Sequence, residues 1–239
     1  MNTAVQAISW QGLALAFLPT FVVIGILIRW TAGAGTAVYA TIRMLVQLLL
    51  IGYVLVYIFS ADQPAVIVGV LMVMLVAASW IAIRPVRDKQ PRAYFNALIA
   101  ITVAGVLTLG LVSQLVINVE PWFSPRYVVP LAGMIFAGAM NTVSLAAERM
   151  QAEIDRDISY LEARRIALQA SLIPMINSLL AVGLVSLPGM MTGQILSGVS
   201  PMVAAKYQIV VMSMLFGVSG ISAALYLVLQ YRNENQDVR

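Results

Sequence analysis

The chain contains no cysteine and no histidine, and only 10% of its 239 residues are charged. The absence of cysteine excludes disulfide bonds. Together with the absence of histidine, it excludes zinc sites built from thiolate and imidazole ligands. A soluble domain of this length would carry about 25% charged residues. The low charge content therefore indicates a protein that is largely surrounded by lipid.

Apolar residues make up 61% of the chain and occur in runs long enough to cross a bilayer. Because these runs are continuous and do not alternate with polar residues, they predict helices and not a transmembrane β-barrel. We expect an all-α, polytopic membrane protein that forms a single domain over residues 1–239. The seven spans that we predict are 10–28, 37–59, 64–83, 93–118, 128–147, 167–187 and 207–231.

Basic residues predict the orientation of these spans, because they collect on the cytoplasmic side of membrane proteins. With the amino terminus outside and the carboxyl terminus in the cytoplasm, only Arg126 and Lys206 face outward, and Arg43 lies within a span. The other basic residues would all face the cytoplasm: Arg29, Arg84, Arg87, Lys89, Arg92, Arg149, Arg156, Arg164, Arg165, Arg232 and Arg239. The net charge of +4 thus fits a cell (inner or plasma) membrane protein, and we expect no nucleic-acid partner.

Residues 172–212 are almost uncharged, yet proline, glycine and amide residues interrupt them. In hydrocarbon, such residues are tolerated only where protein or a water-filled cavity satisfies them. We therefore expect residues 188–206 to form a short outer helix or a re-entrant segment that gates or lines a path. The alternative is that this stretch only caps the bundle. The candidate residues are Asn177, Pro188, Gly189, Met190, Met191, Gly193, Gln194 and Gln208.

Three further polar residues lie within predicted spans. Arg43 lies one turn before Gln47 in the second span. A charged side chain at mid-span costs about 2.5–3.5 kcal/mol, so Arg43 either snorkels, bonds another helix or contacts a substrate. Asn141 in the fifth span is placed to hydrogen-bond across a helix interface.

Two sets of side chains, a pair of small residues and a pair of methionines, are interpreted as packing residues. Gly133 and Ala137 have the small-xxx-small spacing that allows two helices to approach closely. Met190 and Met191 would supply pliable apolar walls. Their thioethers suit Cu(I) and not hard cations, so the sequence assigns no ligand set to a metal.

The most strongly charged segment is 148–165, ERMQAEIDRDISYLEARR. The spacing of Ile154, Ile158 and Leu161 predicts an amphipathic cytoplasmic helix, either a solvated connector or a docking element for a cytoplasmic partner. Its charged candidates are Glu148, Arg149, Arg156, Asp157, Glu162, Arg164 and Arg165. The chain carries no P-loop and no nucleophile–base pair in an enclosed setting, so we do not expect an enzyme.

Three blocks resemble the FetB family of ABC transporter permeases, the membrane subunits of proposed iron exporters. They are residues 40–55 (ATIRMLVQLLLIGYVL), 130–145 (PLAGMIFAGAMNTVSL) and 172–212, which contains SLPGMMTGQILSG. The plant aluminium-tolerance permeases are similar. The likeness covers most of the chain.

This resemblance implies a permease subunit that exports iron, another metal or a metal complex. Two permease chains would pair with two copies of a cytoplasmic ATP-binding cassette subunit. ATP would bind to that partner, and this chain would need no cofactor of its own. The alternative is a membrane subunit with a structural or signalling role. An ion-coupled secondary transporter would need carboxylates within its spans, and the predicted spans contain none.

Overall fold

The computed structural model describes residues 8–60, 63–86 and 91–237, with side chains up to Gln230. These residues form helices, and the one isolated β-bridge among them joins Val182 to Ser186. The all-α prediction is therefore confirmed. The chain divides into two compact units, 1–60 and 61–239, and its function as one domain stays a prediction. The basic residues Arg87, Lys89 and Arg239 and the side chain of Arg232 lie outside the described part.

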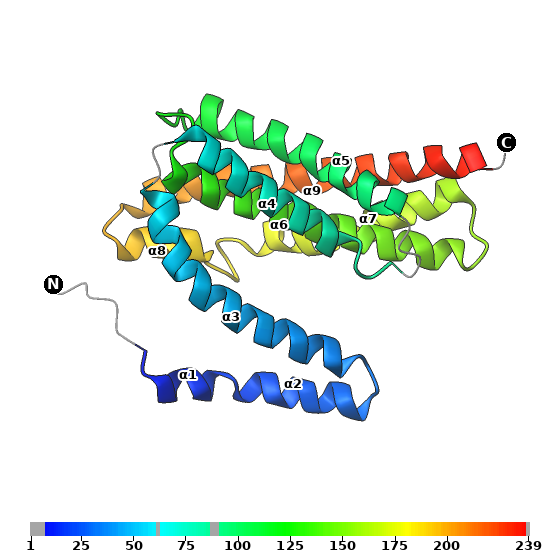
Figure 1. The fold of residues 1–239 in the computed structure, drawn as a ribbon, viewed down its shortest axis with the longest axis horizontal. Helices are drawn as coiled ribbons and strands as arrows, with labels where there is room; N and C mark the ends of the chain where they lie inside the picture. Colours follow the sequence, from blue (N-terminus) through cyan, green and yellow to red (C-terminus); the bar gives the residue numbers. More distant parts are fainter. Residues whose placement is uncertain (1–7, 61–62, 87–90, 238–239) are drawn as a thin grey trace. The chain divides into compact units, whose positions relative to one another are not determined.

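The first unit is a helical hairpin. Helices α1 (Trp10–Ala16) and α2 (Leu18–Arg29) follow one another, and α3 (Ala34–Phe59) packs back against α2 (Figure 1). The side-chain oxygen of Ser9 caps α1 by accepting a hydrogen bond from the backbone N–H of Gly12 at 3.1 Å. The chain reverses at Gly33, whose φ of 75° lies in the region that glycine adopts without strain.

The second unit is a bundle of long helices. Its members are α4 (Pro64–Ala82), α5 (Pro91–Gly110), a π-helix η1 (Leu111–Val116), α6 (Pro125–Ile154), α7 (Tyr160–Ala181), α8 (Gly189–Leu196) and α9 (Pro201–Asp237). Four of them begin with proline, whose missing N–H would have no helical partner at that position. The π-helix was not predicted from the sequence.

Helix α6 is the centre of this bundle, because it packs against α4, α5, α7 and α9. Its residues Ile135, Phe136 and Val143 are buried. Glycine permits two of the close approaches. A Cβ added at Gly105 of α5 would lie 2.7 Å from the Phe136 ring, and one at Gly138 would lie 3.2 Å from Leu215 of α9.

The residues that make the close contacts of α6 differ in part from the predicted small-xxx-small pair, Gly133 and Ala137. Ala137 is exposed, and a Cβ on Gly133 would make only an ordinary contact, 3.4 Å from Met74. Gly138, next to Ala137, faces α9 instead. The small-xxx-small spacing indicated the right part of α6 but not the face of the helix that makes the close contact. Spacing alone does not say which side of a helix packs against its neighbour.

Six helical segments among the described residues are long and apolar enough to cross a membrane: 10–29, 34–59, 64–82, 91–116, 125–154 and 201–230. They correspond to six of the seven predicted spans. Helix α7, which corresponds to the predicted span 167–187, is not among them because Arg164, Arg165, Gln169 and Asn177 lower its hydropathy. At 1.5 Å per residue its 22 residues are still about 33 Å long, close to the thickness of a hydrocarbon core.

The proline- and glycine-rich stretch after α7 forms a short helix and not a span. Helix α8 has 8 residues, with Pro188 directly before it and Gly198, at a φ of 91°, just after it. It packs against α9 at one end of the bundle. The choice between an outer and a re-entrant position stays a prediction.

The packing of α5 against α6 gives a direct test. In Gly105→Ala, the added methyl group forces the buried Phe136 ring to move. We expect a loss of about 1–3 kcal/mol in stability, measured as a lower Tm of the protein in mild detergent.

The matched control is Gly69→Ala on α4, where an added Cβ meets nothing within 4 Å. Equal Tm values for the two variants would contradict the close α5–α6 contact.

Candidate functional site

A pocket of about 450 Å³ lies between the carboxyl-terminal half of α7, the connection to α8, and α9. It is lined by Met175, Asn177, Ser178, Ala181, Val182, Ser186, Pro188, Met212 and Leu215. Two of the predicted path residues, Asn177 and Pro188, are thus brought together. The lining carries amide, hydroxyl and thioether groups and no charged side chain.

Where helix α7 borders this pocket, its backbone hydrogen bonding is irregular. Pro174 lies inside the helix and has no N–H, so the carbonyl of Ala170 cannot receive the usual backbone hydrogen bond. The hydroxyl of Ser178 donates a hydrogen bond to the carbonyl of Pro174 at 2.9 Å. Beyond Ala181 the chain turns at Gly183, whose φ is 83°. The pocket therefore forms where the regular backbone of α7 is interrupted.

Two amide oxygens at this end of the bundle are buried without a hydrogen-bond partner. They are Oε1 of Gln194 on α8 and Oε1 of Gln208 on α9. Gln208 is 5% exposed and lies one turn before Met212, which lines the pocket. A buried acceptor without a donor costs about 1–3 kcal/mol, so such positions call for a ligand or water that donates hydrogen bonds.

The other predicted path residues do not line this pocket. Gly189, Met190, Met191 and Gly193 belong to α8, where Gly189 and Gly193 are exposed. The sequence prediction places Gly193 in the gate as well, yet a Cβ there would meet nothing within 4 Å. Gly193 is therefore not held by a close contact inside this chain.

Arg43, Gln47 and Asn141 are also not among the residues that line the pocket. Arg43 and Gln47 belong to α3 in the first unit, where Arg43 is half-buried and Gln47 is exposed. Asn141 is exposed on α6. It shares one face of that helix with Ala137, Leu145 and Glu148, all of which are exposed. The expected hydrogen bond from Asn141 to another helix of this chain is therefore absent from the described contacts.

The charged segment 148–165 is a helix–turn–helix and not one continuous amphipathic helix. Helix α6 ends at Ile154, α7 begins at Tyr160, and Asp157 between them has a φ of 61°. The hydroxyl of Tyr160 donates a hydrogen bond to the backbone carbonyl of Leu227, which ties the start of α7 to α9. Periodicity alone could not reveal this break, because the spacing of Ile154 and Ile158 fits a helix.

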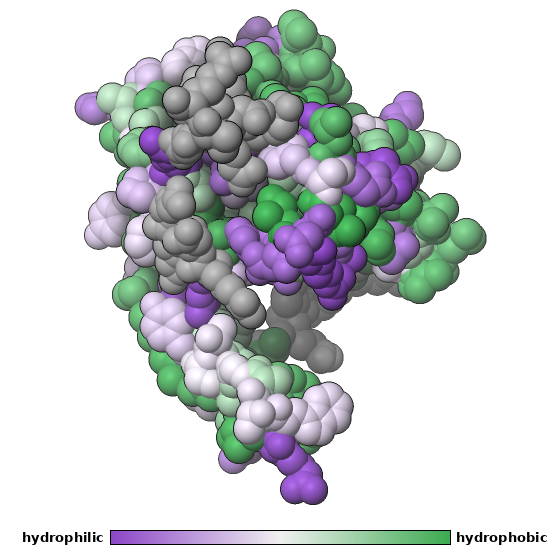
Figure 2. All heavy atoms as spheres, turned by 90° about the vertical axis from the view of Figure 1, so that its right-hand side faces the viewer, coloured by the Kyte–Doolittle hydropathy of each residue, from purple (hydrophilic) through white to green (hydrophobic). Residues whose placement is uncertain are grey.

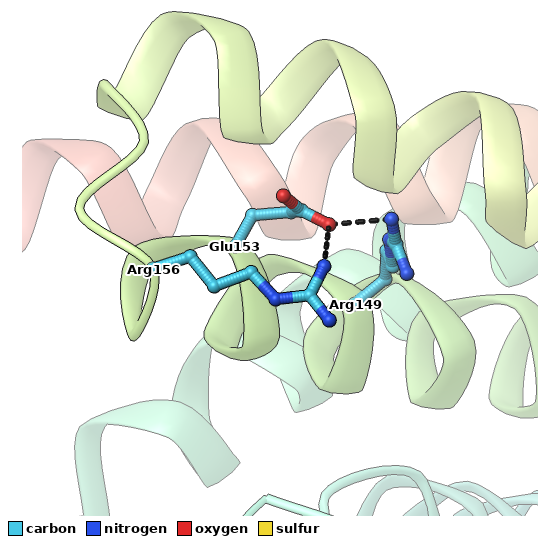
Figure 3. A network of polar contacts seen from close by, with 3 residues as sticks. All are labelled: Arg149, Glu153 and Arg156. Carbon is cyan, nitrogen blue, oxygen red and sulfur yellow. Dashed lines mark hydrogen bonds and ion pairs between the residues drawn. The ribbon is translucent and has the colours of Figure 1, made fainter.

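A buried carboxylate holds the end of α6 (Figure 3). Glu153 is 4% exposed, and its Oε1 lies 2.5 Å from Nη2 of Arg149 and 3.4 Å from Nη1 of Arg156. Nε of Arg149 is buried without a partner. The sequence analysis proposed Arg149 and Arg156 and missed Glu153. The signal was present, because Glu153 lies four residues after Arg149 and three before Arg156.

The other charged candidates lie in and on both sides of the turn between α6 and α7. Arg165 bonds Glu162 at 2.6 Å, and this hydrogen bond holds the pKa of the Glu162 carboxyl below its usual value. Figure 2 shows hydrophilic side chains gathered at the end of the second unit that carries the turn. Two apolar side chains, Ile158 and Leu161, are exposed among them. A polar surface with exposed apolar residues is suited to contact another protein.

The fold and the site define a multi-pass helical membrane protein with an uncharged pocket at one end of its bundle and a charged turn at the other end of α7. The chain matches the family described as "Uncharacterised protein family (UPF0014)" over residues 10–164 and 157–234. It belongs to this family. No solved structure matches it.

Three relatives illustrate the likeness. The probable iron export permease protein FetB of Escherichia coli is 33% identical, over 93% of this chain and 90% of the relative. The UPF0014 membrane protein YjkA of Bacillus subtilis is 32% identical, over 92% and 93%. Protein ALUMINUM SENSITIVE 3 of Arabidopsis thaliana is 32% identical, over 79% and 73%.

The Glu153 network predicts a stability effect. In Glu153→Ala, Arg149 loses its partner while its Nε stays buried. We expect a loss of about 1–3 kcal/mol in stability, seen as a lower Tm in detergent.

Glu162→Ala is the matched control, because it removes the exposed carboxylate paired with Arg165 at the start of α7. We expect it to change the Tm little, since exposed ion pairs contribute little. A Tm that falls equally in both variants would mean that burial of Glu153 has no special role.

Proposed function

We propose that this protein is the membrane permease subunit of an exporter, driven by a separate ATP-binding cassette subunit, that moves iron, another metal or a metal complex. One observation carries the proposal. Helix α7 joins the uncharged pocket at Asn177 to the charged turn before Tyr160. These two residues are about 26 Å apart along the helix. The name of the relative FetB supports iron as a cargo.

The residues proposed for the path fall into two groups. Asn177, Pro188, Gln194 and Gln208 would bind cargo at the pocket end of α7, α8 and α9, with Gly189, Met190, Met191 and Gly193 forming a pliable wall on α8. Arg43, Gln47 and Asn141 would contribute from other surfaces. An exposed amide such as Asn141 has no partner in hydrocarbon. A second permease chain in a homodimer would supply one.

The proposed orientation has the amino terminus outside and the carboxyl terminus in the cytoplasm of the cell membrane. It requires α7 to cross as a seventh span. Its antiparallel course beside α9 supports this, since Tyr160 meets Leu227 at one end and Asn177 shares a pocket with Met212 at the other. The charged turn between α6 and α7 then faces the cytoplasm, as the positive-inside rule favours.

Cysteine labelling tests this orientation, because the chain has no cysteine of its own. An impermeant maleimide should label Glu120→Cys, in the loop before α6, in intact cells. It should label Ser159→Cys, in the α6–α7 turn, only after the cells are made permeable. The reverse pattern would contradict the proposed orientation.

The charged turn is the proposed contact with the ATP-binding subunit, through Glu148, Arg149, Arg156, Asp157, Glu162, Arg164 and Arg165. Purification in mild detergent should yield an ATP-binding cassette subunit together with the wild-type chain. If no such subunit co-purifies, the proposal fails and a structural or signalling subunit is favoured.

Charge reversal tests the contact itself. Arg164→Glu should lower the amount of co-purified ATP-binding subunit and its permease-dependent ATP hydrolysis about tenfold, equivalent to about 1.4 kcal/mol. The variant should insert normally, because a carboxylate near the amino terminus of α7 is favoured by the helix dipole.

The matched control is Lys206→Glu, which reverses an exposed basic residue near the start of α9. It should leave the association unchanged. Normal association and ATP hydrolysis in Arg164→Glu would show that another cytoplasmic segment makes the contact.

A further inference from the structure

The α7–α8–α9 pocket, described above by its nine lining residues, carries no formal charge. Nowhere in the described part of the chain do three or more aspartate, glutamate, histidine or cysteine residues gather as a metal site would require. Moving a bare ion into an apolar setting costs tens of kcal/mol in the continuum limit unless opposite charge compensates it. This pocket provides no such compensation.

The donor atoms of the pocket also fail to match a hard cation. Met175 and Met212 offer thioethers, which suit Cu(I), whereas hard cations take carboxylate, carbonyl and water ligands. Asn177 contributes a single amide oxygen. A bare ferrous or ferric ion would therefore lose most of its hydration here and gain little in exchange.

Two polar side chains of the pocket lining offer oxygens that can accept hydrogen bonds. The hydroxyl proton of Ser178 is already given to the carbonyl of Pro174, so its oxygen is left to accept. The amide oxygen of Asn177, which is exposed, can accept as well. A ligand in the pocket that carries N–H or O–H groups would bond to these oxygens. Oε1 of Gln194 and Oε1 of Gln208 are buried without a partner, but neither residue belongs to the lining.

We propose that this pocket binds an electrically neutral ligand that carries hydrogen-bond donors, so that a metal cargo enters as an uncharged chelate and not as a free ion. The proposal rests on the proposed transport function and specifies the class of its cargo. A volume of about 450 Å³ lies within the range of small-molecule sites. The thioethers of Met175 and Met212 serve as adaptable apolar wall.

Equilibrium dialysis with the purified full-length chain in lipid nanodiscs, without any ATP-binding subunit, tests this. The first probe is ferric tris(acetohydroxamate), a neutral chelate with three N–H donors, in the presence of excess hydroxamate. The second is its N-methyl analogue, which is equally neutral and has no N–H. The third and fourth are free Fe(II) and free Cu(I), kept reduced under anaerobic conditions.

We expect the first chelate to bind and the N-methyl analogue to bind about tenfold more weakly, because the oxygens of Asn177 and Ser178 would then receive no hydrogen bond from the ligand. Free Fe(II) and free Cu(I) should not bind. Asn177→Leu should weaken binding of the first chelate about tenfold, as expected for the loss of one buried hydrogen bond. Asn177 is exposed in the free chain, so this variant should fold normally.

Gln114→Leu is the control. It removes an amide that lines a different, apolar hollow between α4, α5 and α6, and it should leave binding unchanged. Met175→Leu keeps the apolar wall and removes a thioether, so it tests whether sulfur binds a soft ion in the pocket.

Several results would overturn the proposal. Failure of the first chelate to bind would do so, as would equal affinity for the two. Binding of free Cu(I) that Met175→Leu abolishes would instead identify a thioether site for a bare soft ion. These binding measurements need no ATP-binding subunit, so their result does not depend on the outcome of the co-purification experiment. The cargo class can fail while the permease proposal survives, and the converse also holds.

Discussion

The close packing of α6 against its neighbours is the constraint on which the second unit depends. Hydrocarbon offers no hydrophobic driving force between helices, so their association relies on surface fit. Here the fit comes from glycines placed opposite large side chains, Gly105 against Phe136 and Gly138 against Leu215. With α5 and α9 held at these distances, α7 occupies the remaining flank of α6. Both candidate features, the pocket and the charged turn, are built on the helix that this packing fixes in place.

Much of the fold was predictable because composition and run length determine a membrane helix almost by themselves. The start of α4 follows from Pro64, and the short α8 follows from Pro188 and Gly198. Helix α9 begins at Pro201, six residues before the predicted start at 207. The π-helix at 111–116 was not predictable, since its sequence LVSQLV is equally compatible with an α-helix. The break at Asp157 was missed because a positive φ at a non-glycine residue leaves little trace in a sequence.

The site was predictable only in part. Polar residues in an apolar stretch drew attention to Asn177, which lines the pocket, because such residues are costly in lipid wherever they lie. Its role in transport stays a prediction. The partners were not predictable. Met175 and Met212 resemble ordinary packing residues until α7 and α9 are placed side by side. Glu153 was overlooked because its segment is strongly charged, and only the structure shows that it is buried.

Pro174 divides α7 into two stretches with different attachments. The stretch before it is tied to α9 by Tyr160 and carries the charged turn, whereas the stretch after it borders the pocket. Bending the helix at the proline breaks one hydrogen bond fewer than bending it elsewhere. The helix can thus bend at this joint, so that the stretch bordering the pocket changes its angle while the stretch before the proline stays packed against the bundle. A change of shape that travels along α7 between the pocket and the charged turn must pass through that joint.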